Sequence, residues 1–242
     1  MIKDTGVCQL INKSKEASLE LTILMPCLNE AATVGACIDE AATFLKNRRI
    51  SGEILISDNG SMDGSLEIVR RRGARVVVCH EKGYGNALRL GLEQAQGKYI
   101  IMGDCDQSYS FLEIEKMYYL LKNGSDMVIG NRFADGAPTA DAMPFSHRLG
   151  VPILSWLARK RFRCDIKDFH CGLRGVCKSS LEYLDFQTTG MEFATEMIAK
   201  ASMAGMKIAQ TPVRLRPDGR GRKSNLRTVR DGFRHLWVIF AK

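Results

Sequence analysis

The clearest structural signal lies in residues 21–60, LTILMPCLNEAATVGACIDEAATFLKNRRISGEILISDNG. Apolar runs at 21–25 and 53–57 predict two strands, and the longer amphipathic segment between them, about 30–46, predicts a helix. Short apolar runs that alternate with longer amphipathic ones are typical of parallel strands in a sheet covered by helices. This unit therefore predicts an α/β fold.

The same alternation continues to about residue 130. Further helices and strands are expected, in chain order, at 63–72, 75–79, 84–96, 98–103, 110–122 and 126–129. Gly73 and Gly97 stand where a helix commonly ends with a glycine cap. The pattern predicts a Rossmann-like, mainly parallel sheet with flanking helices.

Beyond residue 131 the alternation weakens. A stretch rich in Gly, Pro and Asp at 134–144 predicts a loop, and the segment after it is apolar enough to pack back. The remaining expectations are a helix at 191–204, a strand at 206–215, an irregular segment at 216–225 and a basic amphipathic helix at 226–241. The length of 242 residues fits one α/β domain, preceded by an N-terminal extension over 1–20.

Positive charge is concentrated in the second half of the chain. The net charge is +8, but residues 1–130 hold 15 Lys and Arg against 17 Asp and Glu, whereas 131–242 hold 20 against 10. A basic run consists of Arg214, Arg216, Arg220, Arg222, Lys223, Arg227, Arg230 and Arg234. It could face a diphosphate, anionic lipid headgroups or nucleic acid, or be a solvated face. No aromatic residues for base stacking are interleaved with it, which argues against nucleic acid.

Cysteine usage and hydropathy indicate a cytoplasmic protein. The eight cysteines show no CxxC spacing, and several lie in apolar runs where a thiol packs as a small hydrophobe, so a reduced compartment is favoured. The N-terminus has no apolar signal-peptide core, and nowhere do ~18 apolar residues run together. We expect that the chain does not span a membrane on its own. The apolar run at 236–241 marks either a membrane entry or the end of a helix.

Two carboxylates directly follow the expected strand at 98–103. Asp104 and Asp106, in GDCDQ, would lie at the carboxyl edge of a parallel sheet, where open α/β folds bind ligands. Alternate residues of an extended chain point apart, so both can reach one ion only where the strand ends and turns. Two hard oxygen ligands suit Mg²⁺ or Mn²⁺ that also binds a diphosphate and water. On spacing alone, a polar strand end is an equally good explanation.

Two further strand ends carry polar groups. Asp58 opens DNGSMDGS, in which Gly and Asn allow a tight turn, Asp63 can cap the next helix, and Asp58 stays free to accept hydrogen bonds from a base or ribose. The residues PCLNE, at 26–30, follow the first strand. Each is an ordinary strand–helix turn by itself, but three polar strand ends on one edge of the same sheet predict a ligand site.

Other motifs carry little functional weight. GYGNA at 83–87 is not GxGxxG, and no Walker A sequence occurs, so a dinucleotide or P-loop site gains little support. His170 and Cys171 lack paired ligands at zinc-finger spacing, and no oxyanion motif accompanies them. Glu192 and Glu196 lie four residues apart on one helical face and could be solvated.

Taken together, these motifs resemble those of the family-2 inverting glycosyltransferases, in the branch of dolichyl- and polyprenyl-phosphate mannose or glucose synthases. LTILMPCLNE is similar to the family's P-x-x-N-E strand, SDNGSMDGS to its V-D-D-G-S-x-D-G-T turn, GYGNALRLGL to its glycine-rich helix and GDCDQSY to its D-x-D region. DFHCGLRG resembles the segment that closes over the donor, and GMEFATEMIAKA and RPDGRGRKSNLRTVRDGFRHL resemble the acidic helix and the basic loop with its interface helix. The resemblance implies a GT-A fold over 21–225, with 226–242 as a membrane-interface helix or the start of a membrane anchor.

The resemblance also implies roles for individual residues. Asp104 and Asp106 would hold Mg²⁺ or Mn²⁺ on the diphosphate of a UDP- or GDP-linked hexose, with Asp106 needed for catalysis. Asp58 would recognise the base or ribose. Charge on the departing nucleotide diphosphate would be offset by Arg220, Arg222 and Lys223. Further donor contacts are expected from Pro26, Asn29, Glu30 and Gly85.

The acceptor is left open. A sugar hydroxyl needs a carboxylate base, for which Asp168 and Glu192 are the catalytic candidates. A polyprenyl phosphate is already anionic and needs only positioning, for which Arg148 and Arg174 are candidates. The resemblance favours the lipid phosphate at the cytoplasmic face of a membrane, and leaves room for a membrane-anchoring partner subunit or an oligomer.

Three departures from the family pattern keep other functions open. Asn59 stands where a second Asp is usual, Gln107 follows Asp106 where another acid is common, and the membrane helices of many bacterial members are missing. The alternatives are a transferase that glycosylates a hydroxyl of a glycan, lipid or peptide, and a catalytically silent nucleotide-sugar-binding subunit. A nucleic-acid-binding protein is disfavoured by the acidic sheet edge, and a sugar-nucleotide pyrophosphorylase by the absence of a Gly-rich loop after 21–25.

Overall fold

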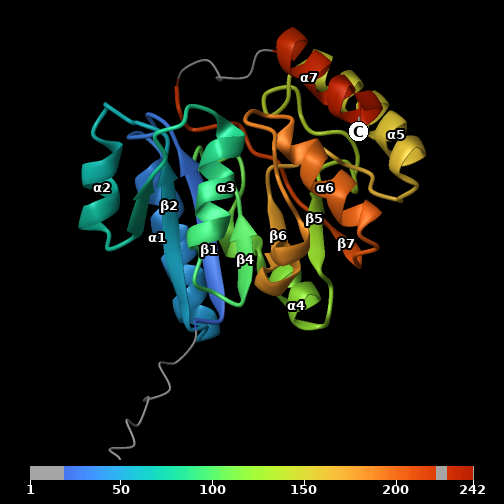
Figure 1. The fold of residues 1–242 in the computed structure, drawn as a ribbon. Helices are drawn as coiled ribbons and strands as arrows, with labels where there is room; N and C mark the ends of the chain where they lie inside the picture. Colours follow the sequence, from blue (N-terminus) through green and yellow to red (C-terminus); the bar gives the residue numbers. More distant parts are fainter. Residues whose placement is uncertain (1–18, 222–227, 242) are drawn as a thin grey trace, which may run out of the picture.

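One sheet of seven strands forms the centre of the computed structural model, which describes residues 19–221 and 228–241. The strand order is β3–β2–β1–β4–β6–β5–β7 (Figure 1). The strands are β1 (Leu21–Cys27), β2 (Gly52–Asp58), β3 (Arg75–Val78), β4 (Tyr99–Met102), β5 (Met127–Asn131), β6 (Arg174–Cys177) and β7 (Ile208–Pro212). Only β6 runs antiparallel to its neighbours, so the prediction of a mainly parallel sheet is confirmed.

Helices cover both faces of this sheet. The α-helices are α1 (Val34–Arg48), α2 (Ser65–Arg71), α3 (Tyr84–Gln94), α4 (Glu115–Lys122), α5 (Phe145–Phe162), α6 (Phe193–Met203) and α7 (Thr228–Ala241), with short 3-10 helices at Phe111–Glu113 (η1) and Lys178–Tyr183 (η2). α3 and α6 lie on one face and α1 and α4 on the other (Figure 1). Gly91 of α3 packs directly on Leu24 of β1, and Gly175 of β6 packs on Met117 and Leu121 of α4.

The central strand β1 fixes the position of the sheet edge that matters for function. All seven of its residues are buried, as expected for a strand with helices on both faces. Its parallel register pairs Cys27 with Asp58 of β2 and Leu24 with Met102 of β4. The carboxyl ends of β1, β2 and β4 therefore meet at one edge, with the three polar segments predicted from the sequence directly after them.

One α-helix and one strand were not predicted from the sequence. The segment after the 134–144 loop forms α5, which contains Pro152 and turns four large apolar residues outward, so it lacks the inward apolar stripe that marks a surface helix. β6, in the RGVC sequence, is too short and too rich in small residues to give a strand signal. It inserts between β4 and β5, which a purely parallel prediction does not anticipate.

α7 packs beside α5 and against α6, beyond the β5–β7 side of the sheet (Figure 1). The predicted C-terminal helix is thus confirmed over the described residues, from Thr228 to Ala241. Most of the expected N-terminal extension, residues 1–18, lies outside the described ranges. Part of the expected irregular segment at 216–225, residues 222–225, also lies outside them. None of the helices in those ranges has the length and apolar character needed to cross a membrane.

Candidate active site

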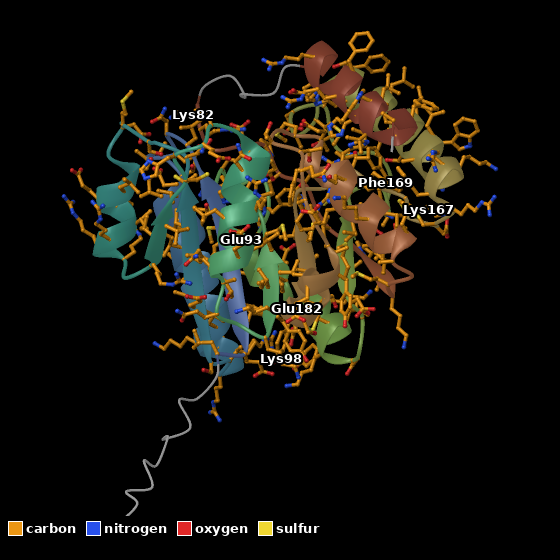
Figure 2. All side chains as sticks on the ribbon, viewed as in Figure 1. Lys82, Glu93, Lys98, Lys167, Phe169 and Glu182 are labelled. Atoms are coloured by element: carbon orange, nitrogen blue, oxygen red, sulfur yellow. The ribbon has the colours of Figure 1, made fainter. Side chains whose placement is uncertain are left out.

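A cavity of about 550 Å³ opens at the carboxyl ends of β1, β2 and β4. Its walls come from the segments that follow these strands, from the start of α3, from the 190–191 segment before α6, and from the first two turns of α7. Lys82, which lines it, lies at the top edge of the sheet in Figure 2, whereas Lys98 and Glu182 lie at the opposite end. The volume is of the size that holds a small ligand in proteins.

Asp104 and Asp106 lie together on the cavity wall, as the sequence predicts. Tyr84 Oη donates a hydrogen bond to Asp104 Oδ1 at 2.9 Å, and the Ser108 amide donates to Asp106 Oδ1 at 3.0 Å. Burial, reinforced by repulsion from Asp106, raises the pKa of Asp104 to about 6. The two neighbouring carboxylates repel each other, so a nearby positive charge stabilises them.

Arg220 supplies positive charge at this point. Its guanidinium lies 2.9 Å from Asp106 Oδ2 and 3.3 Å from Glu30 Oε1. The residue reaches the site because the Gly219 amide donates to the Asp106 carbonyl and the Arg216 amide donates to the Ser108 carbonyl, which fixes the chain beside the 106–108 turn. The structure therefore brings Glu30, Asp106 and Arg220 together from three distant parts of the sequence.

The donor set fits a divalent ion only in part. In the described ranges, no group of three or more His, Cys, Asp and Glu side chains is arranged to hold a metal. Asp104 and Asp106 offer hard carboxylate oxygens, so an ion bound here would complete its shell with diphosphate oxygens and water. Gln107, which has a positive φ of 67°, turns the chain after Asp106 and adds no acid.

Asn59 explains one departure from the family pattern. Its Nδ2 donates to the carbonyls of Cys79 and Glu81 at 3.1 and 2.8 Å, and its Oδ1 accepts from the Gly83 amide at 2.8 Å. An aspartate could not donate to those two carbonyls. The amide at this position ties β2 to the β3–α3 loop and shapes the cavity wall.

Asp58 does not have the free carboxylate that the sequence analysis expected. Its side chain is 1% exposed and accepts hydrogen bonds from the amides of Gly60 and Ser61, because the tight turn folds these groups back on it. A role for Asp58 in binding a base or ribose stays a prediction. Asn29, likewise, accepts from the Met62 amide at 2.8 Å and joins the two turns, while Pro26 and Glu30 line the cavity.

Gly85 brings α3 close to the segment before α6. The Gly85 amide donates to the Thr189 carbonyl at 2.9 Å, and a Cβ at Gly85 would lie 2.6 Å from the Thr188 carbonyl. Thr188 is held in turn by Glu196, which is fully buried and accepts from the Thr188 amide and hydroxyl. Gly85 is therefore needed for the close approach of two cavity walls, and Glu196 is buried rather than solvated.

Asp168 is paired with an arginine in the interior of the protein. Its carboxylate is completely buried and forms a two-point ion pair with Arg132 across 36 residues, at 2.7 and 2.9 Å, and it also accepts from the His170 amide. It lines no cavity described here, so the structure does not support the candidate base. The pair is a buried structural one, which sequence spacing could not reveal.

Glu192 precedes α6 and is 3% exposed. Its Oε1 accepts from the Gly190 amide and lies 2.7 Å from an Arg234 nitrogen of α7. Glu192 thus joins α6 to α7 behind the cavity wall. It is also not solvated, because the fold buries the start of α6 under α7.

The two arginines predicted to hold an acceptor phosphate are placed elsewhere. Arg174 is 2% exposed, and its guanidinium donates to the carbonyls of Phe169, Cys171 and Ala194, which leaves it a structural tie beneath the cavity. Arg148 on α5 does not line the cavity. Arg222 and Lys223 lie outside the described residues.

A second, smaller cavity of about 90 Å³ adjoins the first, because Tyr84, Asp104 and Met191 line both. His170 also lines it, with a buried Nε2 that has no hydrogen-bond partner, and its ring meets that of His235 edge-on at 4.4 Å. Burial lowers the pKa of His170 well below its usual value and keeps the ring neutral. The seven cysteines within the described ranges are free thiols, so no disulfide or thiolate metal site forms among them.

Several residues of the cavity were not predicted as site residues. Lys82 reaches it from the β3–α3 connection and Tyr84 from the first position of α3, whereas Arg230, Asp231 and Arg234 reach it from α7. The i, i+4 spacing of Arg230 and Arg234 within the basic run indicated a shared helical face, but not which surface that face meets.

The fold and this cavity define the class of the protein: a glycosyltransferase of the GT-A type. Crystal structures of glucosyl-3-phosphoglycerate synthase from Mycobacterium tuberculosis superpose on 93% of the chain and 80% of their own, one of them with a TM-score of 0.73 at 21% identity. The chain belongs to glycosyl transferase family 2, whose profile matches residues 22–184.

Two relatives from Haloferax volcanii are informative. The chain is 32% identical to the low-salt glycan biosynthesis hexosyltransferase Agl6 over 97% of its own length, but it spans only 56% of that relative. It is 28% identical to a dolichyl-phosphate hexose transferase over 80% of its length and 82% of the relative. The resemblance inferred from the motifs is thus confirmed at the level of the family and its hexose-transferring branch.

Proposed function

We propose that this protein transfers a hexose from a nucleoside diphosphate sugar to a polyprenyl or dolichyl phosphate at a membrane surface, with inversion at the anomeric carbon. The observation that carries the proposal is the pairing of both candidate bases, Asp168 and Glu192, with arginines. An acceptor hydroxyl has to lose a proton to a base during attack. A phosphate oxygen is already anionic and needs none.

The donor half of the proposal rests on the carboxylates at the sheet edge. Asp104 and Asp106 would hold Mg²⁺ or Mn²⁺, which when bound neutralises charge on the diphosphate. Arg220, now paired with Asp106 and Glu30, is placed to meet the same anion. The structural relatives crystallised with Mn²⁺ and UDP-glucose support this reading of the edge.

In the proposed reaction, an acceptor phosphate oxygen attacks the anomeric carbon of the hexose. A new carbon–oxygen bond forms to the lipid phosphate as the bond to the donor's β-phosphate oxygen breaks. The nucleoside diphosphate leaves with the bonding electron pair. The protein's task is to orient the two substrates and to stabilise the departing anion, and the positive side chains of the cavity suit that task.

The membrane half of the proposal rests on an apolar surface formed by two helices. α5 exposes Phe145, Leu149, Ile153 and Trp156, and α7 exposes Phe233, Trp237 and Phe240. These side chains recur at three- or four-residue spacing, so each helix carries a stripe, and the helices pack side by side (Figure 1). Aromatic stripes with basic residues beside them are typical of helices that lie in the interface of a bilayer.

Donor turnover tests the proposal. The purified protein is incubated with a panel of UDP- and GDP-hexoses and Mg²⁺ or Mn²⁺, with and without a polyprenyl phosphate in vesicles, and released nucleoside diphosphate is measured. We expect release that needs the lipid phosphate and falls by at least about 100-fold in Asp106→Asn or after chelation. Donor binding without stimulated release would favour a silent binding subunit, and stimulation by a glycan or alcohol would favour a hydroxyl acceptor.

A further inference from the structure

We propose that Arg230, on α7, binds the phosphate group of the acceptor at the mouth of the cavity. The ligand class is a phosphate monoester on a long apolar chain. This inference rests on the proposed function and assigns its acceptor site to one residue of the basic run, which the sequence alone does not single out.

Arg230 lies on the face of α7 that lines the cavity. Arg230 and Arg234 are one turn apart and both line the cavity that contains Asp104 and Asp106. Trp237 is two turns from Arg230 on nearly the same line of the helix, and it is 59% exposed. One helix thus carries a cavity-facing cation and an exposed aromatic residue, two turns apart along nearly the same line.

The other cations that line the cavity are already engaged by protein groups. Arg220 pairs with Asp106 and Glu30, Arg234 pairs with Glu192, and Lys82 Nζ donates to the Asn59 carbonyl at 3.0 Å. Arg230 is exposed, and its guanidinium makes no hydrogen bond or ion pair with another residue of the described ranges. It is therefore available to an incoming anion without the loss of a polar contact to the part of the chain that the structure describes.

The guanidinium of Arg230 has the geometry that suits a phosphate. It presents paired N–H donors that match two oxygens of a phosphate. Arg148 and Arg174, predicted for this task, lie off the main cavity or donate to backbone carbonyls. Arg230 supplies the positive charge that the acceptor needs without disturbing a buried contact.

The aromatic surface of α7 favours a lipid over a soluble phosphate. Phe233 and Trp237 are exposed on the same helix as Arg230, the residue that would hold the phosphate. An apolar chain attached to it can leave the cavity along these rings and remain in the bilayer. A free phosphate ester would use the guanidinium but gain nothing from the aromatic surface.

Steady-state kinetics of Arg230→Gln and Arg230→Lys test this assignment, with a long-chain polyprenyl phosphate in vesicles as the acceptor. We expect Arg230→Gln to raise the acceptor KM about tenfold or more, to leave the donor KM within about twofold, and to be partly rescued by lysine. Arg71→Gln, which removes an exposed arginine from α2 on the far side of the sheet, is the matched control and should change neither constant.

Two further arms identify the ligand and separate the possible failures. A short-chain, water-soluble prenyl phosphate should show the same loss in Arg230→Gln but no effect of Trp237→Ser, whereas the long-chain acceptor should be sensitive to both. An unchanged acceptor KM in Arg230→Gln, with the wild type active on lipid phosphate, overturns this inference alone. A wild type that turns over no lipid phosphate overturns the proposed function and this inference with it.

Discussion

Asn59 shows how a single amide can replace the acid expected at its position. Changing Asn59 to Asp removes two donated hydrogen bonds and sets a carboxylate against the carbonyls of Cys79 and Glu81. We expect the free energy of unfolding to fall by about 1–3 kcal/mol, the usual cost of unsatisfied buried polar groups. Urea unfolding measures it, and Asn47→Asp, at an exposed position on α1, should stay within about 0.5 kcal/mol of the wild type. Equal losses in both variants would contradict the role given to Asn59.

His235 makes stability depend on pH. Burial lowers its pKa to about 4, with Arg174 and Arg234 also lowering it and Asp231 raising it, and the neutral His170 ring packs on it. The pKa of an unfolded histidine is about 6.5. Between pH 6.5 and 4, the unfolded chain therefore binds a proton at this residue that the folded protein does not bind. The free energy of unfolding should therefore fall as the pH drops from about 6.5 towards 4, by up to about 1.4 kcal/mol per pH unit from this group, with no effect at higher pH.

Chemical unfolding of His235→Asn across this range checks the effect. Below about pH 6.5, the slope of the free energy of unfolding against pH should be smaller in the variant than in the wild type. The difference should correspond to nearly one bound proton. His80→Asn removes an exposed histidine and should leave the slope as it is. A wild-type slope in His235→Asn would show that the ring is not buried in the neutral form.

Residues that depend on local sequence could be predicted, and residues that depend on distant partners could not. Asp104 and Asp106 follow a strongly apolar strand, so their place at the sheet edge was predictable. Asp58 belongs to an equally clear motif, yet backbone amides of the turn that follows it donate hydrogen bonds to its carboxylate. The burial of Asp168 by Arg132, and of Glu192 by Arg234, arises from contacts across tens of residues that spacing does not encode.

Among the elements, α5 and α7 carry the exposed apolar surface, and their effect on membrane binding can be measured separately from catalysis. Phe233→Ser combined with Trp237→Ser should weaken binding to anionic vesicles without acceptor by about tenfold or more, since each buried aromatic contributes about 1.5–3 kcal/mol. Vesicle sedimentation measures the partition. Tyr183→Ser removes an exposed aromatic from η2 and should have no effect, whereas equal losses would mean that the surface has no special role.

The elements of the first half were predictable because each helix buries a regular stripe and each strand is short and apolar. α5 was not, because its large apolar residues Phe145, Leu149, Ile153 and Trp156 face outward and Pro152 interrupts the pattern. The outward-facing apolar residues that support membrane binding are thus the same residues that made α5 hard to predict from the sequence. β6 was not predicted because its pairing with β4 and β5, not its own sequence, makes it a strand.

For the molecule as a whole, one sheet edge collects the functional groups. The acids Glu30, Asp104 and Asp106 follow β1 and β4. The cations of α7 line the other side of the cavity, and the same helix carries the exposed aromatic residues. This arrangement suits a reaction between a water-soluble donor and an acceptor held in a membrane.

The fate of the sugar tests this account most directly. The protein is given a nucleoside diphosphate hexose labelled in the sugar, a divalent cation and vesicles that contain polyprenyl phosphate, and the label is followed into the organic phase. The account predicts one labelled, acid-labile hexosyl phospholipid for each nucleoside diphosphate released. Label that stays in water as free hexose, or that passes to a hydroxyl acceptor, would contradict it.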